Sequence, residues 1–280
     1  MTKTGGPART YGIRSQGRNG ICAVTTLHDD IFIVRYDSQH IEVYDDVTFA
    51  LQRRISVPGL GSWPNGLTTC SRHMYLYLSD YDNDIVRRVE LVGSNPVMRW
   101  SVDSGPEGLS VNRAHNLVVT CRKAEKLQEY TSHGSLVKEI CLQACSPWPW
   151  HAVQLSTGQY AVSHSTSPGV VSVVGADGEL VHSYEPSETA ADVGRMECPT
   201  SLAVTSNDDI LVADEDNNRI LSINRLSGCV QELSLPVDGK IQEPRALCLD
   251  ESRRRLYVGE WSGDHRLLVF DYVTELSVIL

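Results

Sequence analysis

The residues of this sequence best suited to chemistry recur at one phase of a repeating pattern, directly after a residue that is proline in five of six copies. Glu107 and Asn65 fall at this phase, and His151 falls one residue later. Together they offer oxygen and nitrogen ligands of the kind that a hard or borderline cation takes. One histidine is too few for a three-histidine zinc site, and an ion pair between Glu107 and Arg245 is an equally good interpretation. The residues at this phase are Asn19, Asn65, Glu107, Trp150, Thr200 and Arg245.

Motifs that mark enzymes do not occur in the sequence. It contains no Gly-rich phosphate loop, no nucleophile elbow and no HExxH run. The eight cysteines lack the spacing of a disulfide scaffold or a zinc site, and Cys141 and Cys145 are the only close pair. Most of them fall in predicted strands, where a free cysteine packs as a small hydrophobic residue. We therefore expect no catalytic residue, no metal and no cofactor, so the protein is not expected to be an enzyme.

The spacing of the repeated phase predicts the fold. The residues that precede it are separated by 46, 42, 43, 50 and 45 residues, and a unit of this length indicates a β-propeller. A β-sandwich or a β-barrel has similar strand content but does not explain a repeat of this length. The residues that set the phase are Arg18, Pro64, Pro106, Pro149, Pro199 and Pro244.

Each repeat contains three clear strands and a fainter fourth one. In the clearest copy, residues 199–204 form the first strand, 209–214 the second, 215–218 a polar turn and 219–223 the third. Outer strands face more solvent, so their weaker apolar pattern is expected. The predicted fold class is all-β, a six-bladed β-propeller of four-stranded antiparallel blades. The expected blades are residues 18–60, 61–103, 104–145, 146–192, 193–238 and 239–280.

The chain is expected to form one domain over residues 11–280, after a flexible lead at residues 1–10. No Gly/Ser/Pro linker or break in composition interrupts the repeat. Either residues 11–15 or residues 273–280 could supply the last outer strand. No apolar stretch is long enough for a signal peptide or a membrane helix, so the simplest expectation is a cytoplasmic protein without membrane association.

The motif Ile210-Leu211-Val212-Ala213-Asp214, followed by a polar turn and Asn218-Arg219-Ile220, resembles the NHL repeat. A second copy of the turn is recognisable at residues 80–85, and the resemblance covers nearly the whole chain. The resemblance implies six blades, and the sequence looks most like the C-terminal propeller of tripartite-motif (TRIM-NHL) proteins. In those proteins RING, B-box and coiled-coil modules precede the propeller, so such modules are expected outside this chain.

One face of the propeller is expected to carry the binding site. In propeller folds, the loops that lead into the innermost strands and the turns between second and third strands lie on the same, upper face. Aromatic residues among acidic ones are typical of protein interfaces, because tryptophan and tyrosine bury a large area at small entropic cost. The alternative for each tryptophan is packing between blades. The candidates for binding are Trp63, Asn65, Tyr81, Glu107, Trp150, His151, Arg245 and Trp261.

The sequence-based expectation is a non-catalytic interaction module that recognises a protein or peptide, as the substrate-recognition part of a TRIM-like ubiquitin ligase. The net charge of −10 disfavours a general RNA footprint. A local basic patch at Arg122, Lys123 and Lys126 keeps RNA binding, in post-transcriptional regulation, as the first alternative. The second alternative is a metal-dependent propeller hydrolase or lyase.

Overall fold

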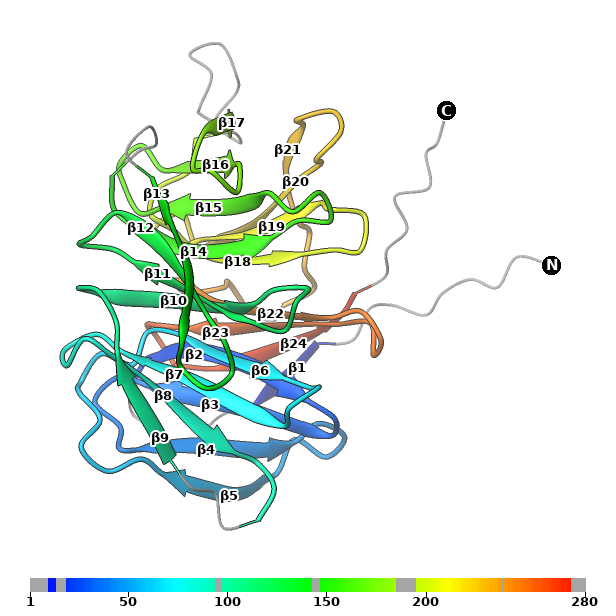
Figure 1. Cartoon of the computed structure of the whole chain (residues 1–280). Coiled ribbons are helices and arrows are strands. Elements are labelled where there is room, and N and C mark those ends of the chain that lie inside the picture. Colours follow the sequence, from blue (N-terminus) through cyan, green and yellow to red (C-terminus); the bar gives the residue numbers. More distant parts are fainter. Residues whose placement is uncertain are drawn as a thin grey trace.

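A computed structural model describes residues 10–13, 19–93, 97–142, 147–184, 195–237 and 239–272 of the chain. These residues form six four-stranded antiparallel sheets, and each sheet is one blade of a β-propeller (Figure 1). The predicted fold class is confirmed. Among the described residues no helix occurs, and so none that is long and apolar enough to cross a membrane.

In each of the first five blades, the four strands follow one another from the inside to the outside. The bounds are β2 (Ile21–Leu27), β3 (Asp30–Arg35), β4 (His40–Asp45) and β5 (Leu51–Ser56) in blade 1; β6 (Leu67–Cys70), β7 (Tyr75–Asp80), β8 (Ile85–Glu90) and β9 (Val97–Ser101) in blade 2; β10 (Pro106–Val111), β11 (Leu117–Cys121), β12 (Lys126–Tyr130) and β13 (Leu136–Cys141) in blade 3; β14 (Pro149–Gln154), β15 (Tyr160–His164), β16 (Val170–Val174) and β17 (Leu180–Tyr184) in blade 4; and β18 (Pro199–Val204), β19 (Ile210–Asp214), β20 (Arg219–Ile223) and β21 (Val230–Glu232) in blade 5.

Blade 6 closes the ring with strands from both ends of the chain. It contains β22 (Pro244–Asp250), β23 (Arg255–Glu260) and β24 (Leu267–Asp271), and β1 (Thr10–Ile13) pairs antiparallel with β24 as the outer strand (Figure 1). The sequence analysis named residues 11–15 and residues 273–280 as candidates for the last outer strand. The strand comes from the N-terminal segment. The other, residues 273–280, lies outside the described residues. Pairing the first and last strands leaves β24 without an open edge.

The hydrophobic core is divided among the blade interfaces. The described residues contain six clusters of buried side chains, and each cluster combines residues from two successive blades. Val34 and Leu78 belong to the cluster between blades 1 and 2, for example, and Ile21 and Tyr257 to the cluster between blades 6 and 1. Burial of these apolar surfaces fixes the angle between neighbouring blades, and that angle places the residues of the innermost strands around one axis.

A polar contact between the end of the second strand and the beginning of the third recurs in every blade. Asp80 accepts from Arg87 (2.9 Å), and Asp214 accepts from Arg219 (2.7 Å). In blade 1 the charges are exchanged, because Arg35 donates to Glu42 (3.1 Å). The remaining blades use Glu260 with Arg266, Cys121 with Gln128, and His164 with Ser172. Asp80 and Asp214, which begin the two acidic turns of the NHL pattern, therefore have a structural role.

Candidate active site at the channel mouth

The innermost strands of all six blades line a narrow central channel. A cavity of about 30 Å³ in this channel is bordered by residues of β2, β10, β14 and β22, among others, including Trp150, His151 and Arg245. A cavity of this size has room for water but not for an organic substrate. Chemistry on a larger molecule would therefore take place at the upper end of the channel.

Two rings of side chains surround that upper end. The first comes from the start of the innermost strands, and the second comes from the residue directly after each second strand. We call the polar and indole side chains gathered here the channel mouth. It consists of Trp63, Asn65, Glu107, Arg122, Trp148, Trp150, Glu215, Arg245 and Trp261. The sequence analysis placed these two sets of loops on one face, and the contacts described next join them.

Arg245 occupies the centre of the channel mouth. Its guanidinium carbon lies 4.4 Å from the ring centroid of Trp261, 4.6 Å from that of Trp150 and 5.7 Å from that of Trp63. The residue is 8% exposed. Nη1 of Arg245 donates to Oε1 of Glu215 (3.2 Å). Stacking on indole faces holds the guanidinium flat and leaves only its edge for hydrogen bonds.

A second arginine approaches Trp150. The guanidinium carbon of Arg122 lies 5.0 Å from the centroid of Trp150 and 5.1 Å from that of Trp148. Nη1 of Arg122 donates to Oε1 of Glu107 (3.1 Å), and Nδ2 of Asn65 donates to Oε2 of the same carboxylate (2.6 Å). The expected pair of Glu107 and Arg245 is thus replaced by two others, Glu107 with Arg122 and Glu215 with Arg245.

Four buried polar atoms of the channel mouth have no hydrogen-bond partner among the described residues. They are Oδ1 of Asn65, Nε of Arg122, Oε2 of Glu215 and Nε of Arg245. Buried polar atoms are nearly always satisfied in folded proteins, so a cluster of exceptions needs an explanation. Two donors and two acceptors without partners make the channel mouth a candidate site for a polar ligand.

Burial raises the pKa of both carboxyl groups of the channel mouth. Burial raises the pKa of Glu107 to about 7, although Arg122 and Arg245 lower it. Burial likewise raises the pKa of Glu215 to about 7 against the opposing effect of Arg245. Carboxyl groups with pKa values in this range can give and take protons at neutral pH, and such groups cluster at functional sites.

His151 is built into the channel wall and is not available as a ligand. Its Nε2 lies 3.1 Å from the carbonyl oxygen of Leu109, and its Nδ1 accepts from the backbone N–H of Leu202 (3.0 Å). Burial lowers the pKa of His151 to about 4, so the ring is neutral. Both ring nitrogens connect neighbouring blades. In the part of the chain that the structure describes, no group of three or more His, Cys, Asp or Glu side chains could hold a metal ion.

The remaining candidates lie at the edge of the channel mouth. Tyr36 makes edge contacts with Trp63 and Trp261 at centroid distances of 4.6 and 5.6 Å, and these two indoles stack at 5.6 Å. Tyr81 carries the ammonium of Lys123 over its ring at 4.5 Å. Several of the predicted tryptophans therefore pack on one another and on Arg245, and Trp148, 49% exposed, offers the more open indole surface.

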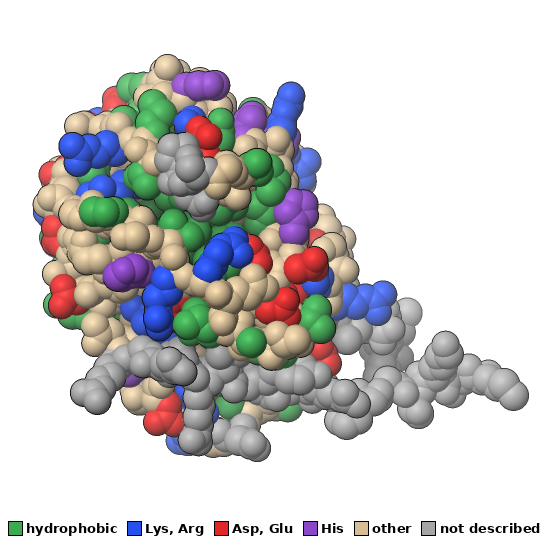
Figure 2. Space-filling view, turned by 90° about the horizontal axis from the view of Figure 1, so that it is seen from below, with side chains coloured by type: hydrophobic (Ala, Val, Ile, Leu, Met, Phe, Trp, Pro, Cys, Tyr) green, Lys and Arg blue, Asp and Glu red, His purple; other side chains and the backbone are tan. Residues whose placement is uncertain are grey.

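The three residues of the predicted RNA patch do not form one basic surface. Arg122 pairs with Glu107, whereas Lys126 pairs with Asp103 (2.7 Å) and Glu139 (3.4 Å). Lys123 lies over Tyr81. On the face drawn in Figure 2, Lys and Arg side chains are mixed with Asp and Glu side chains. This arrangement offers little free positive charge to a phosphate backbone.

Sequence reasoning placed Glu215 and Trp148 on the upper face but did not select them as candidates for binding. Glu215 was interpreted as part of a polar turn. In the structure its neighbour Asp214 makes the ion pair with Arg219 in this turn, whereas Glu215 contacts Arg245. The signal that could have found Glu215 is its phase: it directly follows a second strand, as Arg122 and Trp261 do in blades 3 and 6.

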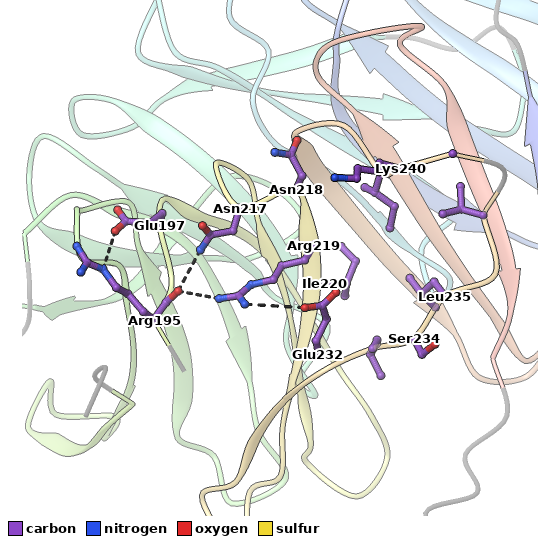
Figure 3. Close-up of a pocket in the computed structure, with 14 residues that line it drawn as sticks. Arg195, Glu197, Asn217, Asn218, Arg219, Ile220, Glu232, Ser234, Leu235 and Lys240 are labelled. Atoms are coloured by element: carbon purple, nitrogen blue, oxygen red, sulfur yellow. Dashed lines mark hydrogen bonds and ion pairs between the residues drawn. The ribbon is translucent and has the colours of Figure 1, made fainter. Parts of the chain in front are cut away.

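A larger groove of about 650 Å³ lies at the rim between blades 5 and 6 (Figure 3). Several of its polar groups are paired: Arg219 donates to Asp214 and to the carbonyl oxygen of Arg195 (both 2.7 Å), and Arg195 donates to Glu197 (3.0 Å). None of the buried unpartnered atoms found among the described residues belongs to a residue lining this groove. The channel mouth is the better candidate for chemistry, because buried polar atoms without partners lie there.

Comparison with known proteins supports the fold and one repeat. The NHL repeat family matches residues 196–221, the copy that the sequence analysis found clearest, and the described residues as a whole form a six-bladed β-propeller. A search of curated proteins by sequence found no match.

Solved propeller structures match nearly the whole chain. A streptogramin B lyase superposes with a TM-score of 0.68 at 13% identity, covering 94% of this chain and 97% of that one. The virginiamycin B lyase from Staphylococcus aureus gives 0.68 at 12% identity, with coverage of 95% and 99%. A catalytically inactive histidine-to-alanine variant of that enzyme, with quinupristin, gives 0.67 at 10% identity, with coverage of 95% and 100%. At these identities the likeness shows the fold.

The likeness corrects the expectation of a protein that is not an enzyme. The predicted non-catalytic module for protein or peptide recognition is contradicted, because similar structures include lyases built on the same kind of propeller. The absence of a local catalytic motif was not a sufficient reason for this expectation. An active site at a propeller mouth can be assembled from single residues of separate blades, and such a site leaves no local motif in the sequence.

Proposed function

We propose that the chain is an eliminating enzyme, a lyase, whose active site is the channel mouth and whose general base is Glu215. The proposal rests on the hydrogen bonding and the pKa of the Glu215 carboxylate. Its Oε1 is held by Arg245 (3.2 Å), its Oε2 has no partner among the described residues, and burial raises its pKa to about 7. A fixed carboxylate with a free oxygen and a pKa near the working pH is suited to proton abstraction.

The proposed reaction is a β-elimination. Oε2 of Glu215 takes a proton from the carbon next to a carbonyl group of the substrate, and the electron pair of that C–H bond forms a carbon–carbon double bond. The bond to the leaving group on the next carbon breaks, and the leaving group departs with its electron pair. It then receives the proton from Glu215, which restores the carboxylate. No oxidant or reductant is needed.

The other residues of the channel mouth stabilise charge in this scheme. Negative charge develops on the substrate carbonyl oxygen as the proton leaves, and the unpartnered Nε–H of Arg245 is a donor for it. Both oxygens of Glu107 are already hydrogen-bonded, to Arg122 and Asn65. Glu107 is therefore a positioning residue that fixes Arg122 rather than a second base.

The fold likeness supports the class of reaction. Proteins described as lyases share the propeller over nearly its full length, and one of them is inactivated by replacement of a histidine. In this chain His151 has both ring nitrogens engaged. The proposal accordingly assigns proton transfer to a carboxylate and not to a histidine.

The test uses methyl β-acetoxyhydrocinnamate as a substrate probe. Elimination releases methyl cinnamate and acetate, whereas ester hydrolysis releases products without the new double bond, so chromatography separates the two outcomes. Wild-type protein is expected to form methyl cinnamate above the rate in buffer, and E215Q is expected to lose about 100-fold or more of this activity. Hydrolysis alone, or elimination that E215Q retains, would contradict the proposal. K240M, in the rim groove, is the matched control and should keep full activity.

The other sequence-based expectations stay predictions. They are the resemblance to tripartite-motif propellers, RING, B-box and coiled-coil modules outside this chain, an RNA or protein partner, and a cytoplasmic location.

A further inference from the structure

The hydrogen-bond inventory of the channel mouth indicates what part of a substrate it would hold. Arg122 and Arg245 each use one nitrogen for a glutamate and each keep a buried Nε–H without an acceptor among the described residues. Both guanidinium groups stack near Trp150, at 5.0 and 4.6 Å. Two arginine donors near one indole are suited to a planar group with two acceptor oxygens.

We infer that the substrate of the channel mouth carries a carboxylate, bound between Arg122 and Arg245, with an aromatic or flat apolar group beside it. The inference rests on the proposed function and specifies the chemical class of its substrate. A carboxylate has two oxygens that accept in one plane, and an arginine guanidinium is the donor that matches this geometry best.

The charge balance of the site favours an anion. Arg122 and Arg245 remain cationic at all accessible pH values. Glu107 faces these two arginines, and Glu215 faces Arg245, Asp216 and Glu243. Because burial raises the pKa of both glutamates to about 7, the two carboxylates do not fully offset the arginines at neutral pH. A ligand carboxylate supplies the missing negative charge.

The position of the apolar part follows from Trp148. Its indole is 49% exposed, and the guanidinium of Arg122 lies 5.1 Å from its ring centroid. An aromatic ring attached a few bonds from the carboxylate can therefore stack on Trp148 while the carboxylate reaches Arg122. Trp63 and Trp261 are less open, since they already contact each other and Tyr36.

The experiment is a calorimetric binding series with hydrocinnamate, its neutral isostere hydrocinnamamide, and inorganic phosphate. Hydrocinnamate is expected to bind at least 10-fold more tightly than the amide and than phosphate, and more tightly at pH 6 than at pH 8, with proton uptake. R122M and R245M should each weaken binding about 10-fold or more, whereas K240M should leave it unchanged. W148A should weaken hydrocinnamate but not acetate.

Equal binding of acid and amide would overturn the inference, and so would equal binding of phosphate or an effect of K240M as large as that of R122M. The comparison of acid with amide uses wild-type protein, so it stands even where R245M does not fold. Failure of the two proposals is distinguishable. If hydrocinnamate binds but no probe is eliminated, the proposed lyase activity is refuted and the carboxylate-binding site stands. If the neutral methyl ester is eliminated but hydrocinnamate binds no better than hydrocinnamamide, only the carboxylate-binding site is refuted.

Discussion

Oε1 of Glu215 accepts a hydrogen bond from Nη1 of Arg245 at 3.2 Å, although the two residues belong to different blades. Glu215 directly follows β19 of blade 5, and Arg245 lies at the start of β22 of blade 6. The pair exists only because blades 5 and 6 pack at the angle set by their shared core. Both the general base proposed for this protein and the cation beside it therefore depend on the assembly of the ring.

The activity should depend on pH through Glu215. The base acts in its ionised form, and its pKa is raised to about 7 by burial. We expect kcat/KM for elimination to rise with pH up to about 7 and to level off above it, because the fraction of ionised Glu215 follows that course. A pH–rate profile from pH 5 to 9 measures it. A profile that is flat across pH 7 would show that another group abstracts the proton.

Stability should show the opposite dependence on pH. The carboxyl group of Glu107 has a pKa of about 7 in the folded protein and an ordinary value of 4.5 when unfolded. Between these values the folded state binds more protons than the unfolded state, so the free energy of unfolding falls as pH rises from 4.5 through about 7. E107Q should reduce this fall, as measured by urea denaturation at several pH values. The other carboxyl groups are the same in the wild type and in E107Q. If the free energy of unfolding falls by the same amount with pH in both proteins, the burial of an ionisable Glu107 is contradicted.

The contact that recurs between second and third strands should be essential where it is a buried ion pair. Asp80 and Arg87 are 0% and 4% exposed at their side chains, so D80A leaves an uncompensated buried cation and should cost about 3–5 kcal/mol of unfolding free energy. The exposed pair of Arg53 and Asp30 is the matched control, and R53A should cost less than about 1 kcal/mol. Chemical denaturation compares the two. Equal costs would mean that the buried contact has no special role.

Removal of residues 1–13 should destabilise blade 6. This truncation deletes β1, which pairs with β24 along four residues, and it exposes the edge of β24. We expect a lower melting temperature and concentration-dependent aggregation, because an open edge can pair with another chain. Thermal unfolding at two protein concentrations tests this expectation. A truncated protein as stable and as monomeric as the full chain would show that β1 is not the closing strand in solution.

The fold could be predicted from the sequence because each blade is a local unit. The phase of Pro64, Pro106, Pro149, Pro199 and Pro244 marks the start of an innermost strand or the approach to it, and the strands within a blade follow one another. Ring closure could not be assigned, since β1 is four residues long and its partner lies at the other end of the chain.

The site was predicted only in part, for a related reason. Asn65, Glu107, Trp150 and Arg245 share one phase of the repeat, so their common face was foreseeable. Which glutamate pairs with which arginine depends on the angle between blades and on side-chain direction, and neither follows from spacing. Glu215 pairs with Arg245 and Glu107 with Arg122, a result that only the packed blades determine.

The most direct test of the central claim is hydrogen exchange at the carbon from which Glu215 is proposed to take its proton. Methyl hydrocinnamate has no leaving group, so in D2O a bound molecule can lose that proton and regain a deuteron without eliminating. We predict that wild-type protein deuterates the carbon next to the carbonyl group, as detected by mass spectrometry, and that E215Q does so at least about 100-fold more slowly. Absence of exchange with the wild type, or equal exchange with E215Q, would contradict the account.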